Sequence, residues 1–249
     1  MPPKWLLVCA TKPEWGELKK HLHFEKDHTF HGLNFYCAQT AKKEILLGQI
    51  GVGYEIAERK AHTIFHSFVN PPQLVIHFGL SGALKEGLKE GDLILPTCVV
   101  NPDKQSVAVS PDLIQKTKTL LQSLNFPFLE GNFFTSAKVL SSPTLKKKAG
   151  EEFDAIAVDM ETYPLAKECQ KAGIPFLSIR AIWDPLEWDL SALSETSFDH
   201  DGNLKRRHFL GNALAHPRLL LALPKYRSAI IKGNKAIARF LMEALEKWE

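Results

Sequence analysis

The feature that most constrains the fold is an apolar run with an arginine in its middle. The run Phe176-Leu177-Ser178-Ile179-Arg180-Ala181-Ile182 has no polar alternation, which predicts a strand buried on both faces. A charge inside such a strand costs several kcal/mol unless it is paired or takes part in chemistry. Arg180 therefore needs a partner, and Glu161 is the nearest candidate in the sequence. A buried structural ion pair explains these residues equally well.

Composition adds only broad limits. The chain has 249 residues, of which 45% are hydrophobic and 24% are charged, as in ordinary globular proteins with a sizeable core. No shift in composition marks a linker, so residues 1–249 are predicted to form one domain. Composition alone says nothing further about activity.

Charge and cysteine usage exclude several classes of function. The formal net charge of +3 is too small to indicate a nucleic-acid surface, and the clusters Lys146–Lys148 and Lys205–Arg207 are interpreted as solvated faces. The four cysteines show no Cys-x-x-Cys spacing, which is typical of reduced packing residues without a metal. The apolar stretch Trp5–Cys9 is too short for a signal peptide or a membrane span. A cytoplasmic location is predicted.

Strands and helices are predicted to alternate through the first 180 residues. This order favours an α/β fold, with a mixed, largely parallel sheet and helices on both faces. Residues 185–249 are expected to form a long loop followed by C-terminal helices. The predicted strands are 5–10, 33–38, 44–50, 74–78, 91–100, 133–140 and 176–182. The predicted helices begin after Thr11 and cover 54–68, 112–124, 142–150, 164–172, 210–223 and 227–248.

Several polar residues and glycines can be explained by local structure, without a catalytic role. Glu14 follows Thr11 and Pro13 at the start of a predicted helix, where capping alone accounts for an acid. His77 is interpreted as a core histidine. The glycines of 48–53 are a weak nucleotide-binding signal, because the full spacing and a phosphate-loop lysine are missing. The small residues of 79–83 leave room for a ligand at the carboxyl edge of the sheet.

Four motifs in the same order resemble the purine nucleoside phosphorylase and nucleosidase superfamily. They cover roughly residues 5 to 184 and are Ala10-Thr11-Lys12-Pro13-Glu14, Gly79-Leu80-Ser81-Gly82-Ala83-Leu84 with Gly91-Asp92-Leu93-Ile94-Leu95-Pro96, Val158-Asp159-Met160-Glu161-Thr162, and Pro175 to Asp184. Within the superfamily, the chain looks closest to the methylthioadenosine/S-adenosylhomocysteine nucleosidase branch. Asp184-Pro185 and His216-Pro217 resemble the hopanoid-associated members, which are proposed to remove adenine from adenosylhopane.

The resemblance implies a mechanism that physical chemistry supports. Cleavage between ribose and a purine passes through a sugar cation, so the base must become a better leaving group. Asp184 resembles the general acid that protonates the imidazole ring of the purine, and burial should raise its pKa. Glu14 resembles the ionised carboxylate that orients the attacking water. Glu161 is similar to the ribose ligand, with Met160 packing on the sugar, and Arg180 would hold Glu161 or the water network.

The remaining expected site residues also come from the resemblance. Val139 and Leu140 match the strand whose backbone contacts the purine edge, and Gly79, Leu80 and Ser81 match the glycine turn. Leu80 stands where relatives have serine or threonine, so only its backbone amide remains for water or phosphate. The expected partner is a small purine nucleoside, with no metal or organic cofactor and no nucleic acid. Relatives imply a homo-oligomer, with a dimer favoured.

Three functions remain open, and hydrolysis is preferred. Phosphorylases place an arginine just before the glycine turn, whereas this chain has His77-Phe78-Gly79 and keeps Glu14, so water is favoured over phosphate. A catalytically idle nucleoside-binding module is the third alternative, since fold alone does not establish chemistry. The aromatic and apolar residues Trp183, Trp188, Leu193 and Phe198 suit either a hydrophobic 5' substituent or a seam between subunits.

Overall fold

The computed structural model describes residues 4–30, 33–65, 70–191 and 217–248. Its strands are β1 (Lys4–Cys9), β2 (Glu25–Phe30), β3 (Leu33–Gln39), β4 (Glu44–Gln49), β5 (Leu74–Ala83), β6 (Leu93–Val100), β7 (Ser106–Ala108), β8 (Phe128–Thr135), β9 (Ala157–Asp159) and β10 (Phe176–Asp184). Its helices are η1 (Lys12–Trp15), η2 (Leu18–Lys20), α1 (Tyr54–Phe65), α2 (Pro111–Ser123), α3 (Pro143–Phe153), α4 (Thr162–Ala172) and α6 (Pro217–Lys247).

One mixed sheet organises the fold. Its strand order is β10-β6-β8-β9-β5-β1-β4-β3-β2, with β7 beside β6 and a further pairing of β10 with β5. Strands β4, β1, β5 and β10 run parallel to one another, and so do β6, β8 and β9. The two groups meet antiparallel at β10–β6 and β5–β9. The expected mixed α/β sheet is therefore confirmed.

Strand β5 changes its neighbour partway along its length. It pairs with β1 up to His77 and with β9 from Gly82 onward, while β10 accompanies its other edge. Among the described strands, none pairs with Phe78–Ser81 on the side where β1 ends and β9 begins. Backbone amides and carbonyls there must find other partners, which makes this opening a natural place for ligand or side-chain contacts.

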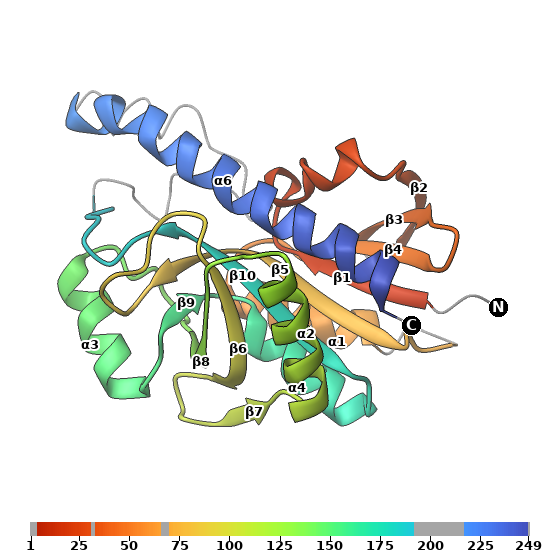
Figure 1. The fold of residues 1–249 in the computed structure, drawn as a ribbon. Coiled ribbons are helices and arrows are strands. Elements are labelled where there is room, and N and C mark those ends of the chain that lie inside the picture. Colours follow the sequence, from red (N-terminus) through yellow and green to blue (C-terminus); the bar gives the residue numbers. More distant parts are fainter. Residues whose placement is uncertain (1–3, 31–32, 66–69, 192–216, 249) are drawn as a thin grey trace.

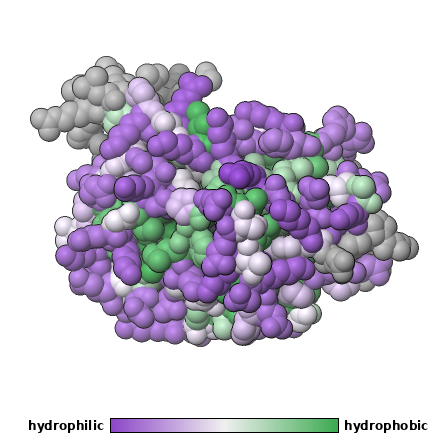
Figure 2. Space-filling model, viewed as in Figure 1, coloured by the Kyte–Doolittle hydropathy of each residue, from purple (hydrophilic) through white to green (hydrophobic). Residues whose placement is uncertain are grey.

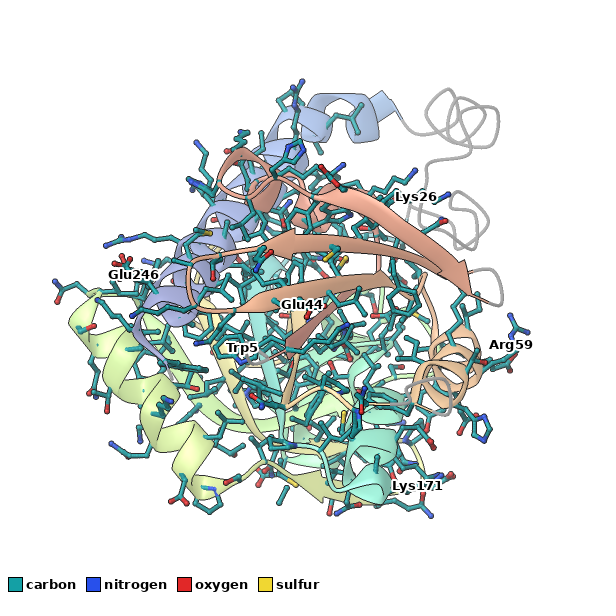
Figure 3. All side chains as sticks on the ribbon, turned by 90° about the vertical axis from the view of Figure 1, so that its right-hand side faces the viewer. Trp5, Lys26, Glu44, Arg59, Lys171 and Glu246 are labelled. Atoms are coloured by element: carbon teal, nitrogen blue, oxygen red, sulfur yellow. The ribbon has the colours of Figure 1, made fainter. Side chains whose placement is uncertain are left out.

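Buried strands and amphipathic helices enclose one main core. The cluster of buried apolar residues extends from β1 through β5, β6 and β10 to α6. Helix α6 packs on β10, β5 and β6, and it runs across the top of the sheet in Figure 1, whereas α1 and α4 contact each other below it. Trp5 and Glu44 lie on the adjacent strands β1 and β4, as Figure 3 shows.

The surface gives no indication of a membrane-spanning segment in the part of the chain described. Polar residues cover most of the face in Figure 2, with hydrophobic residues visible between them. Among the described residues, no helix is both long and apolar enough to cross a membrane.

Several predicted boundaries differ from the structure. The helix expected after Thr11 is two short 3-10 helices, and β2 was not predicted. Strand β5 continues through the expected glycine turn to Ala83. Strand β8 ends at Thr135, so Val139 and Leu140 lie in the following loop. The two expected C-terminal helices are one helix that passes through Pro224, and residues 192–216 of the predicted loop lie outside the described residues.

Candidate active site

Glu14 is held by three backbone amides from two parts of the chain. Its Oε2 accepts hydrogen bonds from the N–H groups of Ala10 at 2.9 Å and Thr11 at 2.8 Å. Its Oε1 accepts one from the Leu80 N–H at 3.0 Å, in the opening of β5. The contact with Thr11 is the helix-capping arrangement expected from the sequence, but the bond to Leu80 reaches 66 residues along the chain. Glu14 is therefore also fixed against the central sheet.

Gly79 makes room for this carboxylate. A Cβ at residue 79 would lie 2.3 Å from Glu14 Oε1 and 3.0 Å from Arg180 Nη1, and the backbone φ of +154° is rarely adopted by L side chains. The side chains of Glu14 and Arg180 thus meet over the bare Cα of Gly79. Any larger residue would push them apart.

Arg180 forms a closed network with three polar side chains. Its Nη2 lies 3.2 Å from Asp159 Oδ2 and donates to the Leu80 carbonyl at 2.6 Å. Its Nη1 lies 3.1 Å from His77 Nε2, and His77 Nδ1 lies 3.0 Å from Thr162 Oγ1. Since arginine only donates, His77 accepts at Nε2 and donates from Nδ1 to Thr162, whose hydroxyl donates to Asp159.

His77 is neutral in this arrangement. Burial, and next the charge of Arg180, hold its pKa well below the usual range. The interpretation as a hydrogen-bonded core histidine is thus supported, with the added finding that it orients Arg180. Arg180 pairs with Glu161, as expected, at 4.0 Å from Oε2, and the structure adds Asp159 as a closer partner at 3.2 Å.

Glu161 lies at the end of the same network and is held by the glycine segment after β4. Its Oε1 accepts a hydrogen bond from the Gly53 N–H at 2.7 Å, and its Oε2 accepts one from the Met160 N–H at 3.3 Å. Burial, and next the nearby charge of Asp159, raise the pKa of Glu161 to about 8, while Arg180 opposes the rise. Near neutral pH its carboxyl can therefore carry a proton and exchange hydrogen bonds with hydroxyl groups in either direction.

Asp184 ends β10 and is paired with a buried lysine. Lys146 Nζ lies 2.7 Å from Asp184 Oδ1. Burial raises the pKa of Asp184 to about 6, although the charge and hydrogen bond of Lys146 oppose that rise. A carboxyl group with a pKa near neutrality suits general acid catalysis.

These groups lie along adjacent segments of β5 and β10. Glu14 and Arg180 meet at Gly79, and Glu161 is next to Arg180. Asp184 follows Arg180 by four residues on β10 and pairs with Gly82. The three acids predicted from distant parts of the sequence are therefore linked through adjacent segments of β5 and β10.

The structure also gives the contacts and exposure of the other expected site residues. The Leu80 amide, expected to bind water or phosphate, instead donates to Glu14. Ser81 is buried, with its hydroxyl directed to the Ala181 carbonyl at 3.5 Å. Met160 is half-buried beside Glu161, whereas Val139 is exposed in the loop after β8 and Leu140, in the same loop, is half-buried.

The structure adds six residues to the site that the motifs did not indicate, five through their side chains and Gly53 through its backbone N–H. They are Gly53, His77, Thr135, Lys146, Asp159 and Thr162. The Thr135 hydroxyl donates to Asp159 Oδ1 at 3.0 Å. Lys146 had been interpreted as part of a solvated face, and that was wrong because its side chain is 0% exposed. Within the described residues, no group of three or more His, Cys, Asp or Glu side chains is arranged to hold a metal ion.

Fold and site together define an α/β protein with acidic side chains gathered on two inner strands, β5 and β10, of a mixed sheet. A sequence profile described as the phosphorylase superfamily matches residues 4–209. The chain belongs to the phosphorylase superfamily, as its motifs predicted.

Curated and structural relatives agree with this assignment. The 5'-methylthioadenosine/S-adenosylhomocysteine nucleosidase of Staphylococcus epidermidis is 25% identical over 195 residues, which cover 72% of this chain and 85% of that protein. A mutant Helicobacter pylori MTAN with 5'-methylthioadenosine in its active site has a TM-score of 0.78 at 19% identity and covers 99% of this chain and 100% of its own. The futalosine hydrolase of Helicobacter pylori has a TM-score of 0.78 at 18% identity, with 98% of each chain covered. The expected enzyme class, an N-glycosidase, agrees with these names.

Proposed function

We propose that this chain hydrolyses the N-glycosidic bond of a purine nucleoside that carries a modified 5' position. The proposal is supported by the contacts of three acids with adjacent segments of β5 and β10. Glu14 accepts from the Leu80 N–H, Glu161 lies 4.0 Å from Arg180, and Asp184 pairs with Gly82. An enzyme of this class needs an acid at the base, a ligand for the sugar hydroxyls and a carboxylate for water. The three acids can fill these three roles.

In the proposed mechanism, Asp184 protonates the imidazole ring of the purine while the bond to ribose lengthens. Burial of Asp184 favours its protonated form, and a protonated purine leaves more easily. Glu161 binds the ribose hydroxyls, beside Met160. Glu14 accepts a hydrogen bond from the water that attacks the ribosyl cation. Because Ala10, Thr11 and Leu80 already hold both oxygens of Glu14, its orientation is set before substrate binds.

Phosphorolysis is the second candidate, and the charges near β5 favour water over phosphate. His77 precedes the opening as a buried residue whose lowered pKa keeps it neutral. Arg180 is paired with Asp159 at 3.2 Å. A bound phosphate would bring two negative charges close to Glu14 without a matching cation from either residue.

Substrate identity is tested with a panel of nucleosides. The panel contains adenosine, 5'-methylthioadenosine, S-adenosylhomocysteine, futalosine, inosine and a lipid-bearing adenine nucleoside, with free base and free sugar measured for each. We expect adenine release, fastest from a substrate with a substituted 5' carbon. A lipid-bearing nucleoside as the best substrate would support the resemblance to the hopanoid-associated members. Absence of base release from every compound would contradict the proposed function.

The 5' substituent is expected to lie near the turn that follows β10. Trp188 is buried there and its ring lies 5.3 Å from that of Tyr226 on α6, while Trp183 lies 6.3 Å from the same ring. The other two expected lining residues, Leu193 and Phe198, fall outside the described residues. A homodimer and a cytoplasmic location remain predictions.

A further inference from the structure

Lys146 is a buried cation that the proposed mechanism does not yet use. It lies on α3, and its side chain is 0% exposed. Its ammonium group donates to Asp184 Oδ1 at 2.7 Å, to the Pro185 carbonyl at 2.9 Å and to the Trp188 carbonyl at 2.9 Å. Three acceptors satisfy all three donors of a lysine. The surroundings of Lys146 are therefore suited to an ammonium group, because each of its three N–H donors has an acceptor.

The contacts of Lys146 fix the turn after β10 as well as the carboxyl group. The Trp188 N–H donates to the Pro185 carbonyl at 3.1 Å, which closes the turn on itself. The Leu190 N–H donates to the Ser141 carbonyl at 2.7 Å, next to the start of α3. The turn is thus attached to the α3 segment at both of its ends.

The two oxygens of Asp184 have different surroundings. Oδ1 is bound by Lys146, whereas Oδ2 lies on the side of Gly82, where a Cβ would come within 3.2 Å of it. Within the described residues, the hydrogen bond that Asp184 receives is at Oδ1. A proton on the carboxyl group is therefore favoured at Oδ2, because the ammonium repels a proton at Oδ1.

We propose that Lys146 is a positioning residue for Asp184: it binds Oδ1, holds the turn after β10, and leaves Oδ2 as the oxygen that protonates the leaving purine. This inference rests on the proposed nucleosidase function. It assigns the role of the general acid to one oxygen and gives the buried lysine a task in the reaction.

Lys146 also sets the strength of the acid. Burial raises the pKa of Asp184 and Lys146 counteracts it, with a resulting pKa of about 6. Among the described residues, two further titratable groups act near Asp184. Glu187 raises its pKa further, and Tyr226 of α6 has its own pKa raised by burial and next by the charges of Asp184 and Asp189. Glu187 acts in the same direction as burial, so among the groups that the structure describes around Asp184, Lys146 is the one that lowers its pKa.

The test compares Lys146→Met with Lys147→Met. Lys147 is on the same helix, but its side chain is 62% exposed and its nearest acid, Glu86, is 4.0 Å away. We expect Lys146→Met to lower kcat per folded enzyme by at least about 10-fold on the low-pH plateau, where Asp184 is protonated in both proteins, within the range general acid catalysis supplies. The upper limb of its pH profile should move to higher pH, because the positive charge that favours ionised Asp184 is gone. KM should change by less than about 3-fold, and Lys147→Met should match the original protein.

A second variant separates positioning from a purely structural role. Lys146→Met is expected to lower the free energy of unfolding, since carbonyl groups lose their donor, so rates are expressed per folded enzyme. Lys146→Gln keeps an N–H donor without the charge, and its pH limb should move in the same direction. A purely structural role would reduce the folded fraction and leave kcat and the pH limb unchanged. That result in either folded variant would overturn the inference.

The same experiment distinguishes failure of this inference from failure of the proposed function. If the original protein and Lys147→Met release base but Lys146→Met and Lys146→Gln behave like them, only the positioning role is wrong. If the original protein releases no base from any nucleoside of the panel, the nucleosidase proposal itself fails.

Discussion

Asp184→Asn is expected to lower the rate of base release at pH 7 by about 10²- to 10⁴-fold, the range that general acid catalysis supplies. The amide has nearly the same shape as the carboxyl group but cannot deliver its proton to the purine. Substrate affinity should change little, because the proposed role of Asp184 is in bond cleavage. The measurements are kcat from release of free adenine and the dissociation constant from calorimetry.

The role of Asp184 as the general acid also predicts how kcat/KM depends on pH. Asp184 is active when protonated, and its pKa is raised to about 6 by burial. For the original protein, kcat/KM should therefore fall as pH rises through about 6, and this limb should be absent from Asp184→Asn. The exposed acid Asp189 lies in the same turn, and Asp189→Asn serves as the matched control with an unchanged profile. An Asp184→Asn enzyme with the original rate would remove the general acid from the mechanism.

Glu14→Gln is expected to reduce kcat by about 10²- to 10⁴-fold, because the amide can no longer accept a proton from the attacking water. It should also destabilise the protein by about 1–3 kcal/mol. Both oxygens of Glu14 accept backbone N–H groups, and in glutamine one of these positions becomes an NH₂ group that faces a donor. The rate and the free energy of unfolding are measured together.

Glu17→Gln provides the control for this variant. Glu17 lies three residues further along and pairs with the exposed Lys20 at 2.8 Å, away from β5. Its variant should keep the original rate and nearly the original stability. If Glu14→Gln lost stability but kept its rate per folded enzyme, Glu14 would be a capping residue only, as the simplest interpretation of the sequence allowed.

The buried strands could be predicted from the sequence because their burial is continuous. Strands β5 and β10 have almost no exposed residue along their length, so apolar runs without alternation were a sufficient signal. Strand β2 was missed since its first residues, Glu25 and Lys26, are exposed and polar. An edge strand of this kind is stabilised by its pairing with β3, which periodicity does not reveal.

The acids of the site were predicted through motifs, whereas their partners depend on tertiary contacts. Asp159 and Glu161 belong to the same motif, so the sequence allows either of them to pair with Arg180. Only the structure shows that Asp159 is the closer partner. The resemblance to the family predicts Val139 and Leu140 on a strand, whereas β8 ends at Thr135, before the polar residues Ser136 and Lys138. Their proposed contact with the purine remains a prediction.

The helical spacing around Lys146 indicates which residues of α3 face the core. Lys146 and Ala149 are the buried residues of α3, and their spacing of three places them on one helical face. Lys147 and Lys148 point to other sides of the helix and are exposed, so the three lysines do not share one surface. What no pattern could supply is the acceptor set of Lys146, because Asp184 lies 38 residues away.

The most direct test of the account is a crystal structure of Asp184→Asn with an unreacted adenine nucleoside. We predict that an imidazole nitrogen of the purine lies at hydrogen-bond distance, about 2.6–3.2 Å, from the side chain of residue 184. The ribose hydroxyls should contact Glu161, and a water molecule should lie between Glu14 and the anomeric carbon. A nucleoside bound with its base away from residue 184 and its ribose away from Glu161 would contradict the account.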